Sequence, residues 1–191
     1  MTDRTPKIIF GIDPGNEFTA IVELIRNDIQ FKGKLPNEEF LNWYRGRLIF
    51  QDPEMETVVY CEKMVCMGMA VGKTVFDTCY FIGRLQQIAF DHGIKFHLVS
   101  RMEVKMHTCG TTRAKDANIR QAMIDRYGPV RLPGFKTMKS GKVKEIGIPG
   151  PTHGFSRDMW SALAIASLGS DKQWLAPVRP AHRPKKKVLD T

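Results

Sequence analysis

The alternation of apolar and polar residues predicts strands and a helix at the start of the chain. A short apolar run at residues 8–12 ends in an Asp-Pro-Gly turn, and a second β-type run follows at residues 18–25. Two such runs around a turn predict a β-hairpin. Residues 37–48 carry apolar side chains at helical spacing, and Asn37 is a residue type that caps helices, so we expect a helix there.

The central part of the chain predicts a β-α-β unit. Residues 57–62 are a β-branched run that ends on an acid, residues 73–92 have helical periodicity, and residues 95–99 again have strand character. A strand, a long helix and a strand in this order are typical of a crossover between parallel strands. We therefore expect an α/β architecture.

The helix predicted over residues 73–92 is apolar on two faces. One face carries Val75, Cys79, Ile82, Leu85 and Ile88, and the second carries Phe76, Tyr80 and Phe81. A domain of this size does not easily cover both faces, so the helix is a candidate interface for a homodimer. Burial of both faces in a larger core is the alternative.

The last third of the chain predicts two helices separated by a basic loop. Residues 114–127 are amphipathic, and a helix rich in small residues follows Ser156, its expected cap. Residues 131–153 lack periodicity and are rich in Gly, Pro and Lys, which favours a long loop. We treat residues 1–172 as one domain and residues 173–191 as a basic tail that is disordered when free.

Composition and charge narrow the class of partner. The 191 residues are 42% hydrophobic, which fits one globular domain and excludes a chain that is disordered throughout. Lys and Arg outnumber Asp and Glu by 29 to 20, giving a net charge of +9. Residues 131–144 hold five basic residues and no acid, and the tail from residue 176 holds five against Asp190, so two segments carry the whole excess. Such segments favour nucleic acid as the partner, with a membrane surface second.

The remaining composition indicates a soluble protein without a metal-binding cysteine motif. We find no apolar run long enough to span a membrane and no secretion-signal pattern, and we therefore expect a cytoplasmic protein, bacterial or in the host cell of a phage. The cysteines are Cys61, Cys66, Cys79 and Cys109. Their irregular spacing favours reduced, buried thiols over a zinc site.

Three acids occupy positions that suit a ligand site. Asp13 ends the first predicted strand, Glu62 ends the strand at residues 57–62, and Asp158 lies in the first turn of the last helix. Each alone also fits an ordinary role in a turn, at a solvated strand end or at a helix N-terminus. Together they lie where an α/β sheet presents ligands, and three carboxylates suit Mg²⁺ or Mn²⁺.

Four stretches of the chain follow one another in an informative order. They are FGIDPG at residues 10–15, YCEK at 60–63, EVK at 103–105 with the pair AK at 114–115, and DMWSALAIA at 158–166. The ordered set resembles the RuvC-type Holliday junction resolvases of the ribonuclease H-like superfamily, and the phage-type members more than the bacterial housekeeping enzymes.

The resemblance implies a fold, an activity and a site. It implies a ribonuclease H-like fold with a mixed five-stranded sheet flanked by helices, and a homodimer that cuts four-way DNA junctions by paired nicks in recombination and repair. Asp13 would bridge two Mg²⁺ ions, for which Mn²⁺ can substitute, and Glu62 and Asp158 would complete the cage. Lys105 and Lys115 match family positions that lie near the scissile phosphate, and Lys115 is expected to be catalytic.

One position departs from the family pattern. The last helix of family members usually carries an acid or a histidine one turn after the first acid, and Ser161 stands there in this chain. His153, Ser161 acting through a water molecule, or Asp116 could complete the metal site. We rank His153 first because it immediately precedes the helix.

Further residues are candidates for contacts with DNA. Met64 or Met67 could supply an apolar wedge that unstacks a base, although such residues also pack cores and dimers. Phosphate contacts without base reading are expected from the tail and from the lysines of the basic loop, Lys136, Lys139, Lys142 and Lys144.

Two other functions compete with a metal-dependent endonuclease. Ser161 and the basic segments also fit a non-catalytic protein that binds branched nucleic acid with the same fold. The sequence GIDPG at residues 11–15 also opens sugar-kinase and heat-shock-type nucleotide-binding domains. The chain is too short for their two lobes and has no second Gly-rich phosphate loop, which argues against them.

Overall fold

A mixed five-stranded sheet forms the centre of the molecule. The structure is a computed structural model that describes residues 7–50, 52–66, 68 and 70–175. The strands are β1 (Lys7–Pro14), β2 (Phe18–Ile25), β3 (Asp28–Pro36), β4 (Glu56–Glu62) and β5 (Lys95–Val99), in the spatial order β3-β2-β1-β4-β5. The first three strands are antiparallel, and β4 and β5 run parallel to β1. The predicted α/β fold, its first hairpin and its crossover are confirmed.

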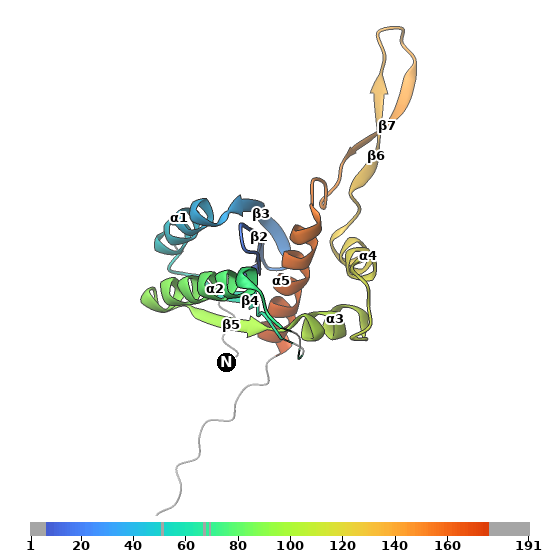
Figure 1. Cartoon of the computed structure of the whole chain (residues 1–191). Coiled ribbons are helices and arrows are strands. Elements are labelled where there is room, and N and C mark those ends of the chain that lie inside the picture. Colours follow the sequence, from blue (N-terminus) through green and yellow to red (C-terminus); the bar gives the residue numbers. More distant parts are fainter. Residues whose placement is uncertain (1–6, 51, 67, 69, 176–191) are drawn as a thin grey trace, which may run out of the picture.

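Helices cover both faces of the sheet (Figure 1). The helices are α1 (Asn37–Ile49), α2 (Lys73–Asp91), α3 (Arg101–Cys109), α4 (Asp116–Tyr127) and α5 (Arg157–Leu175). Side chains alternate along β1, so that Ile8, Phe10 and Ile12 pack with α1 and α2, whereas Ile9 packs with α5 and its neighbours. The central strand is therefore buried on both faces, which accounts for its continuous apolar sequence.

One glycine sets how closely α5 lies on the sheet. A Cβ atom at Gly11 would lie 2.2 Å from the carbonyl oxygen of Ala162 and 2.4 Å from the nitrogen of Ala166. The backbone of α5 thus crosses β1 directly, which explains the small-residue sequence of this helix. Asp158 lies one helical turn before Ala162, so this crossing brings it toward the end of β1.

The outer face of α2 is not covered by the other residues that the structure describes. Its buried residues include Phe81, Ile82 and Leu85, whereas the side chains of Phe76 and Tyr80 are 51% and 72% exposed. The predicted assignment of residues to the two faces is therefore partly wrong: Cys79, grouped with the buried Ile82 and Leu85, is exposed, and Phe81, grouped with the exposed Phe76 and Tyr80, lies in the core. The alternative of double burial within the described domain is wrong.

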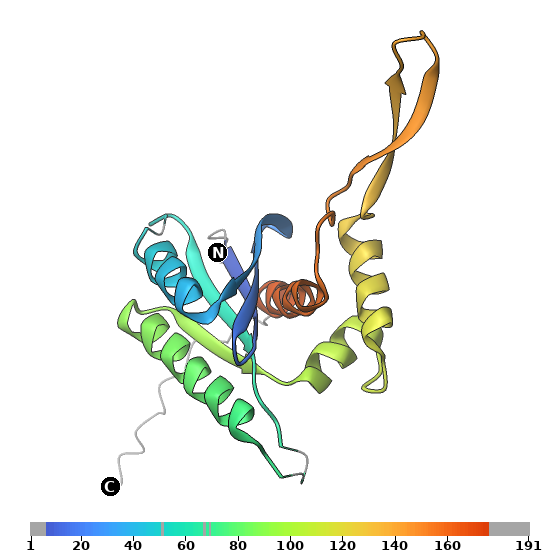
Figure 2. The same cartoon turned by 45° about the horizontal axis from the view of Figure 1, so that its top comes forward.

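The segment predicted as a long loop is a β-hairpin. Strands β6 (Arg131–Thr137) and β7 (Val143–Pro149) pair antiparallel and project from the body beyond α4 and α5 (Figures 1 and 2). Glycines and prolines hide the strand periodicity in this segment. A Cβ atom at Gly134 would lie 2.6 Å from Cγ2 of Ile148, so the glycine makes room for the cross-strand neighbour.

The predicted helix ends need correction. Asn37 does not cap α1; its side chain accepts a hydrogen bond from Thr19 and donates one to the carbonyl of Gly15. The Ser156 hydroxyl is buried and has no hydrogen-bond partner among the described residues. Strand β3 and helix α3 were not predicted, although the capping box of Ser100 and Glu103 marks the start of α3.

Three further observations bear on the composition. All four cysteines are free, and Cys66 and Cys79 are exposed, contrary to the expectation of buried thiols. Among the described helices, none combines the length and the hydrophobicity needed to cross a lipid bilayer. The basic tail expected beyond residue 172 lies outside the described residues from position 176 onward.

Candidate active site

Asp13 and Glu62 come from neighbouring parallel strands. Ile12 of β1 is paired with Cys61 of β4, so the next residue of each strand lies at the same level of the sheet. Carboxyl ends of parallel strands meet at one edge, and side chains at the same level point to the same side. The two acids predicted from the sequence are therefore brought side by side.

Helix α5 adds the third acid and a serine. Its close crossing at Gly11 carries Asp158 and Ser161 to the same edge of the sheet, and the charge of Asp158 acts on Asp13. The hydroxyl of Ser161 is hydrogen-bonded to the Asp13 carboxylate. The other two predicted acids, Glu62 and Asp158, are thus close enough to Asp13 for their charges to act on it.

The gathered acids disfavour one another's negative charge. Burial, followed by the negative charges of Glu62 and Asp158, raises the pKa of the Asp13 carboxyl from 3.8 to about 7. Burial also raises the pKa of Glu62, and the positive charge of Arg101 opposes that rise. An edge with this excess of negative charge attracts cations.

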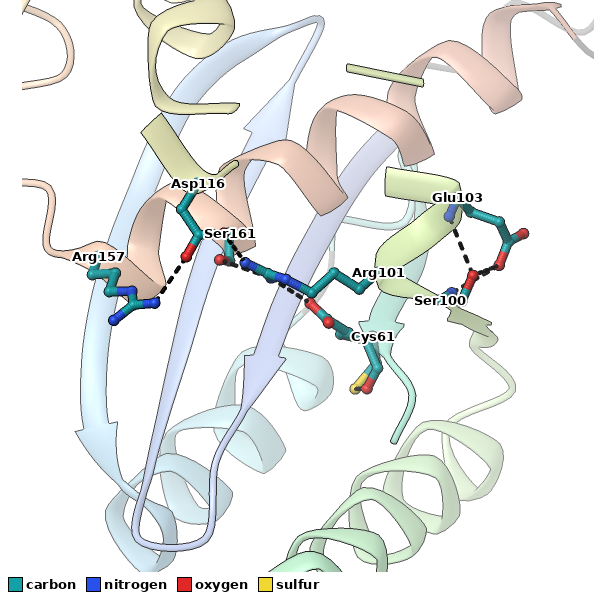
Figure 3. Close-up of polar contacts among 8 residues, drawn as sticks. Cys61, Ser100, Arg101, Glu103, Asp116, Arg157 and Ser161 are labelled. Carbon is teal, nitrogen blue, oxygen red and sulfur yellow. Dashed lines mark hydrogen bonds and ion pairs between the residues drawn. The ribbon is translucent and has the colours of Figure 1, made fainter. Parts of the chain in front are cut away.

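Arg101, at the start of α3, extends toward Ser161 and Asp116 (Figure 3). Its Nη1 donates to Oε2 of Glu62 and to Oγ of Ser161, each at 3.4 Å. Its Nη2 donates to Oδ1 of Asp116 at 2.5 Å, and Asp116 also accepts from Nη2 of Arg157 at 2.9 Å. Neither arginine was predicted; the signal for Arg101 is its place directly after a parallel strand.

Asp158 faces a second cation, Lys34. The Lys34 Nζ lies 2.5 Å from Oδ2 of Asp158. Both residues line a small cavity of about 280 Å³ together with Asp13 and the turn after β1. Lys34 was not predicted because β3, which carries it, was not predicted.

A larger cavity opens on the other side of the acids, beside α4 and α5. It measures about 650 Å³ and is lined by Arg101, Asp116, Arg120, Phe155, Arg157 and Trp160, among others. Three arginines give this cavity a positive wall, and the Phe155 and Trp160 rings, 4.9 Å apart, give it an apolar one. The combination suits a nucleic-acid strand, which offers phosphates and bases.

The donor set suits a divalent metal ion. Three carboxylates supply hard oxygen ligands, and the raised pKa of Asp13 reflects negative charge that a cation would relieve. In the part of the chain that the structure describes, no three His, Cys, Asp or Glu residues stand close enough together to hold an ion as they are. Arg101 pairs with Glu62 and Lys34 pairs with Asp158, so two of the three acids already have a cationic partner.

The other predicted residues lie at different distances from the acids. Lys105 is close enough for its charge to lower the pKa of Glu62. Lys115 is exposed at the start of α4, next to Asp116. His153 is exposed; Lys32 binds its carbonyl, and its ring has no partner among the described residues, so the geometry gives no support to the predicted ligand.

The remaining predicted DNA-contacting residues belong to the stretch after β4 and to the hairpin β6–β7. Met64 is 40% exposed just after β4, and Met67 lies outside the described residues. The four lysines of the predicted loop belong to the hairpin: Lys136 and Lys144 stand opposite each other, and Lys139 and Lys142 lie at its turn.

Solved structures of one protein resemble this arrangement over most of the chain. Thermus thermophilus RuvC matches with a TM-score of 0.61 at 15% identity, covering 91% of this chain and 99% of that one. T. thermophilus RuvC in complex with a Holliday junction substrate matches with a TM-score of 0.60 at 14% identity over the same shares. The chain has the RuvC fold.

Sequence comparison adds nothing to the structural match. No family model matches the sequence, and neither does any curated protein. The match to RuvC covers 99% of that chain, so the likeness in fold extends over nearly all of it. This confirms the fold that the four sequence stretches imply.

Proposed function

We propose that the chain is a metal-dependent endonuclease that resolves four-way DNA junctions by paired nicks, a crossover junction endodeoxyribonuclease. The observation that carries the proposal is the gathering of Asp13, Glu62 and Asp158 at one edge of the sheet, beside an arginine-lined cavity. The RuvC fold supports a nuclease, and the junction-bound RuvC supports branched DNA as the substrate class. The proposal extends to forks and flaps as further branched substrates of the same site.

The residues of the site divide the work of phosphodiester hydrolysis. Asp13, Glu62 and Asp158 would hold divalent metal, Mg²⁺ or Mn²⁺, which would supply an activated water and neutralise charge on the phosphate. In the overall hydrolysis the water oxygen bonds to phosphorus as the bond to the leaving oxygen breaks, and the proton that the water gives up to solvent is balanced by the one that the leaving oxygen takes up. Lys105 and Lys115 supply positive charge on the α3 and α4 side, where we place the scissile phosphate.

The hairpin β6–β7 serves as a DNA-binding arm in this proposal. Lys136 and Lys144 lie directly opposite each other across its two strands, an arrangement that is unfavourable without an anion nearby. Seven residues per strand let the arm reach about 20 Å. An arm of that length with lysines at its end fits the phosphate backbone of a junction arm.

The exposed face of α2 serves as the homodimer interface. Phe76, Tyr80 and Phe90 lie at helical spacing and are 51%, 72% and 77% exposed. Two copies joined there give the two sites that paired nicks require. Tyr80→Glu is expected to convert dimers to monomers in analytical ultracentrifugation, and dimers that persist would place the interface elsewhere.

A junction-cleavage assay with two matched variants tests the activity. Asp13→Asn should lose nicking of a synthetic four-way junction in Mg²⁺ by about 1000-fold or more and keep binding, because it removes the central carboxylate. Asp28→Asn is the control: Asp28 is exposed and pairs with Ile25 at the opposite end of the sheet, so nicking should be unchanged. Undiminished nicking by Asp13→Asn would remove Asp13 from the site.

The same assay separates the competing function. Junction binding by the wild-type chain without nicking, at every Mg²⁺ and Mn²⁺ concentration, would identify a non-catalytic protein that binds branched nucleic acid. Equal binding of linear duplex and junction would contradict branched DNA as the preferred substrate.

A further inference from the structure

Arg101 is the most closely engaged cation of the site. Its guanidinium contacts residues from three different elements: Glu62 at the end of β4, Ser161 in α5 and Asp116 in α4. It also acts on Asp13, which shares the hydroxyl of Ser161 with it. A guanidinium stays charged at every physiological pH, so this position holds a permanent positive charge.

Two different cations pair with the acids of the site, a lysine on the β3 side and an arginine on the α3 side. On the side that faces β3, Asp13 and Asp158 line the small cavity together with Lys34. The amine of Lys34 pairs with Asp158. On the α3 side, Glu62 and Asp116 share the planar guanidinium of Arg101. Lys34 donates to Asp158, whereas Arg101 donates to acceptors on three elements.

We infer that Arg101 takes the place of one of the two divalent ions, so that each site binds a single metal ion, held by Asp13 and Asp158. This rests on the proposed function, but it replaces the pair of ions that the family resemblance implies and removes Glu62 from the metal ligands. A second divalent ion would need Oε2 of Glu62, which accepts from Arg101, and it would stand beside a fixed positive charge.

Ser161 is consistent with this division of the site. A serine hydroxyl accepts a hydrogen bond from Arg101 and donates one to Asp13, which a carboxylate at the same position could not do. A carboxylate at 161 would instead add a metal ligand. The serine thus fits a neighbour that is an arginine and not a metal ion.

The number of bound ions tests the inference directly. Mn²⁺ is titrated into the full chain, with and without a synthetic four-way junction, and free Mn²⁺ is followed by electron paramagnetic resonance. The wild-type chain should bind one ion per protomer, and Arg101→Gln should bind two, because the Glu62 carboxylate is then free, whereas Asp116 keeps its partner Arg157. Two ions in the wild type, none in the wild type, or one in Arg101→Gln would each overturn the inference.

Three further variants separate charge from structure. Arg101→Lys keeps the positive charge and should still bind one ion. Arg157→Gln removes the other arginine that binds Asp116 but touches neither Glu62 nor Ser161, so its count should remain one. Arg101→Gln combined with Ser161→Asp should bind its second ion more tightly than Arg101→Gln alone, and equal affinity would contradict the role given to position 161.

A junction-cleavage gel run on the same samples distinguishes failure of this inference from failure of the proposed function. A wild-type chain that nicks junctions and binds two ions retains the function and refutes the inference. A wild-type chain that binds one ion and does not nick refutes the function, whereas a second ion in Arg101→Gln would still assign Arg101 as the cation that replaces it. Thermal melts of each variant identify changes that come from misfolding.

Discussion

The acid edge of the sheet and the hairpin β6–β7 carry opposite charge and are built in opposite ways. The acids come from β1, β4 and α5, and each is fixed by a buried element, as when Gly11 lets α5 lie directly on β1. The hairpin is largely exposed, with Phe135 at 73% and Val143 at 65%. The acids of the candidate site thus stand on elements that pack in the core, whereas the lysines stand on an arm that contributes little to the core.

The comparison predicts that changes in the body alter folding and chemistry, whereas changes in the hairpin alter binding alone. The largest effect is expected for Gly11→Ala. Its Cβ would lie 2.2 Å from a backbone oxygen of α5, which cannot move without lifting the helix from the sheet. Unfolding in urea should show a loss of about 3 kcal/mol or more. A loss below about 1 kcal/mol would mean that the helix is free to shift.

Asp13→Asn is expected to stabilise the chain when divalent metal is removed with a chelator. The folded-state pKa of Asp13 lies above its unfolded value, so wild-type stability falls as the pH rises from about 4 to about 7. The variant removes this penalty and should be about 2 to 4 kcal/mol more stable at pH 8, since one pH unit is worth about 1.4 kcal/mol. Urea denaturation at pH 4 and pH 8 measures it, and equal differences at both values would contradict the account.

Replacing the hairpin lysines should weaken binding and leave the body intact. With Lys136, Lys139, Lys142 and Lys144 all changed to Gln, junction affinity at moderate salt should fall about 100-fold, and the slope of log K against log salt by about 3 to 4. The melting temperature should not change. Lys73→Gln with Lys95→Gln, on α2 and β5 away from the hairpin (Figure 1), is the control and should leave the slope nearly unchanged.

A change in cleavage preference in the hairpin variant would contradict purely electrostatic binding. The arm would then read bases or DNA shape, and the division between chemistry and binding would be less sharp than its exposure and charge suggest.

The smallest effect is expected at a helical glycine that has free space around it. Gly46 lies within α1, and a Cβ atom there would meet nothing within 4 Å. Gly46→Ala should therefore raise stability by about 0.5 to 1 kcal/mol through helix propensity. Together with Gly11→Ala it shows that the environment of a glycine, and not glycine itself, decides the effect; a loss of stability in urea unfolding would contradict this.

Residues that end elements could be predicted from the sequence. Asp13 and Glu62 close apolar strand runs and Asp158 opens a helix, and local patterns reveal such boundaries. That Asp13 and Glu62 lie side by side could be predicted as well, because the carboxyl ends of parallel strands meet at one edge of the sheet. The mixed sheet followed from the resemblance and not from periodicity, because the polar pattern of β3 resembles a loop.

Residues that act across elements could not be predicted in the same way. Arg101 meets Glu62, Asp116 and Ser161 from positions up to 60 residues apart, and no local pattern reports such a contact. Lys34 meets Asp158 across 124 residues. His153 was ranked as a ligand on sequence proximity alone, and the turn that precedes α5 leaves it exposed.

The base of the hairpin has a consequence for how this protein changes over time. The nitrogen of Gly150 donates to the carbonyl of Val130 at 3.0 Å, so the chain leaves the body and returns to it at one point. A Cβ atom at Gly150 would lie 2.0 Å from the carbonyl oxygen of Pro129, and only glycine fits this neck. Because the two strands join the body at this one point, we expect that an arm of another length or charge can replace the segment between Val130 and Gly150 without changing the packing of the sheet and its helices.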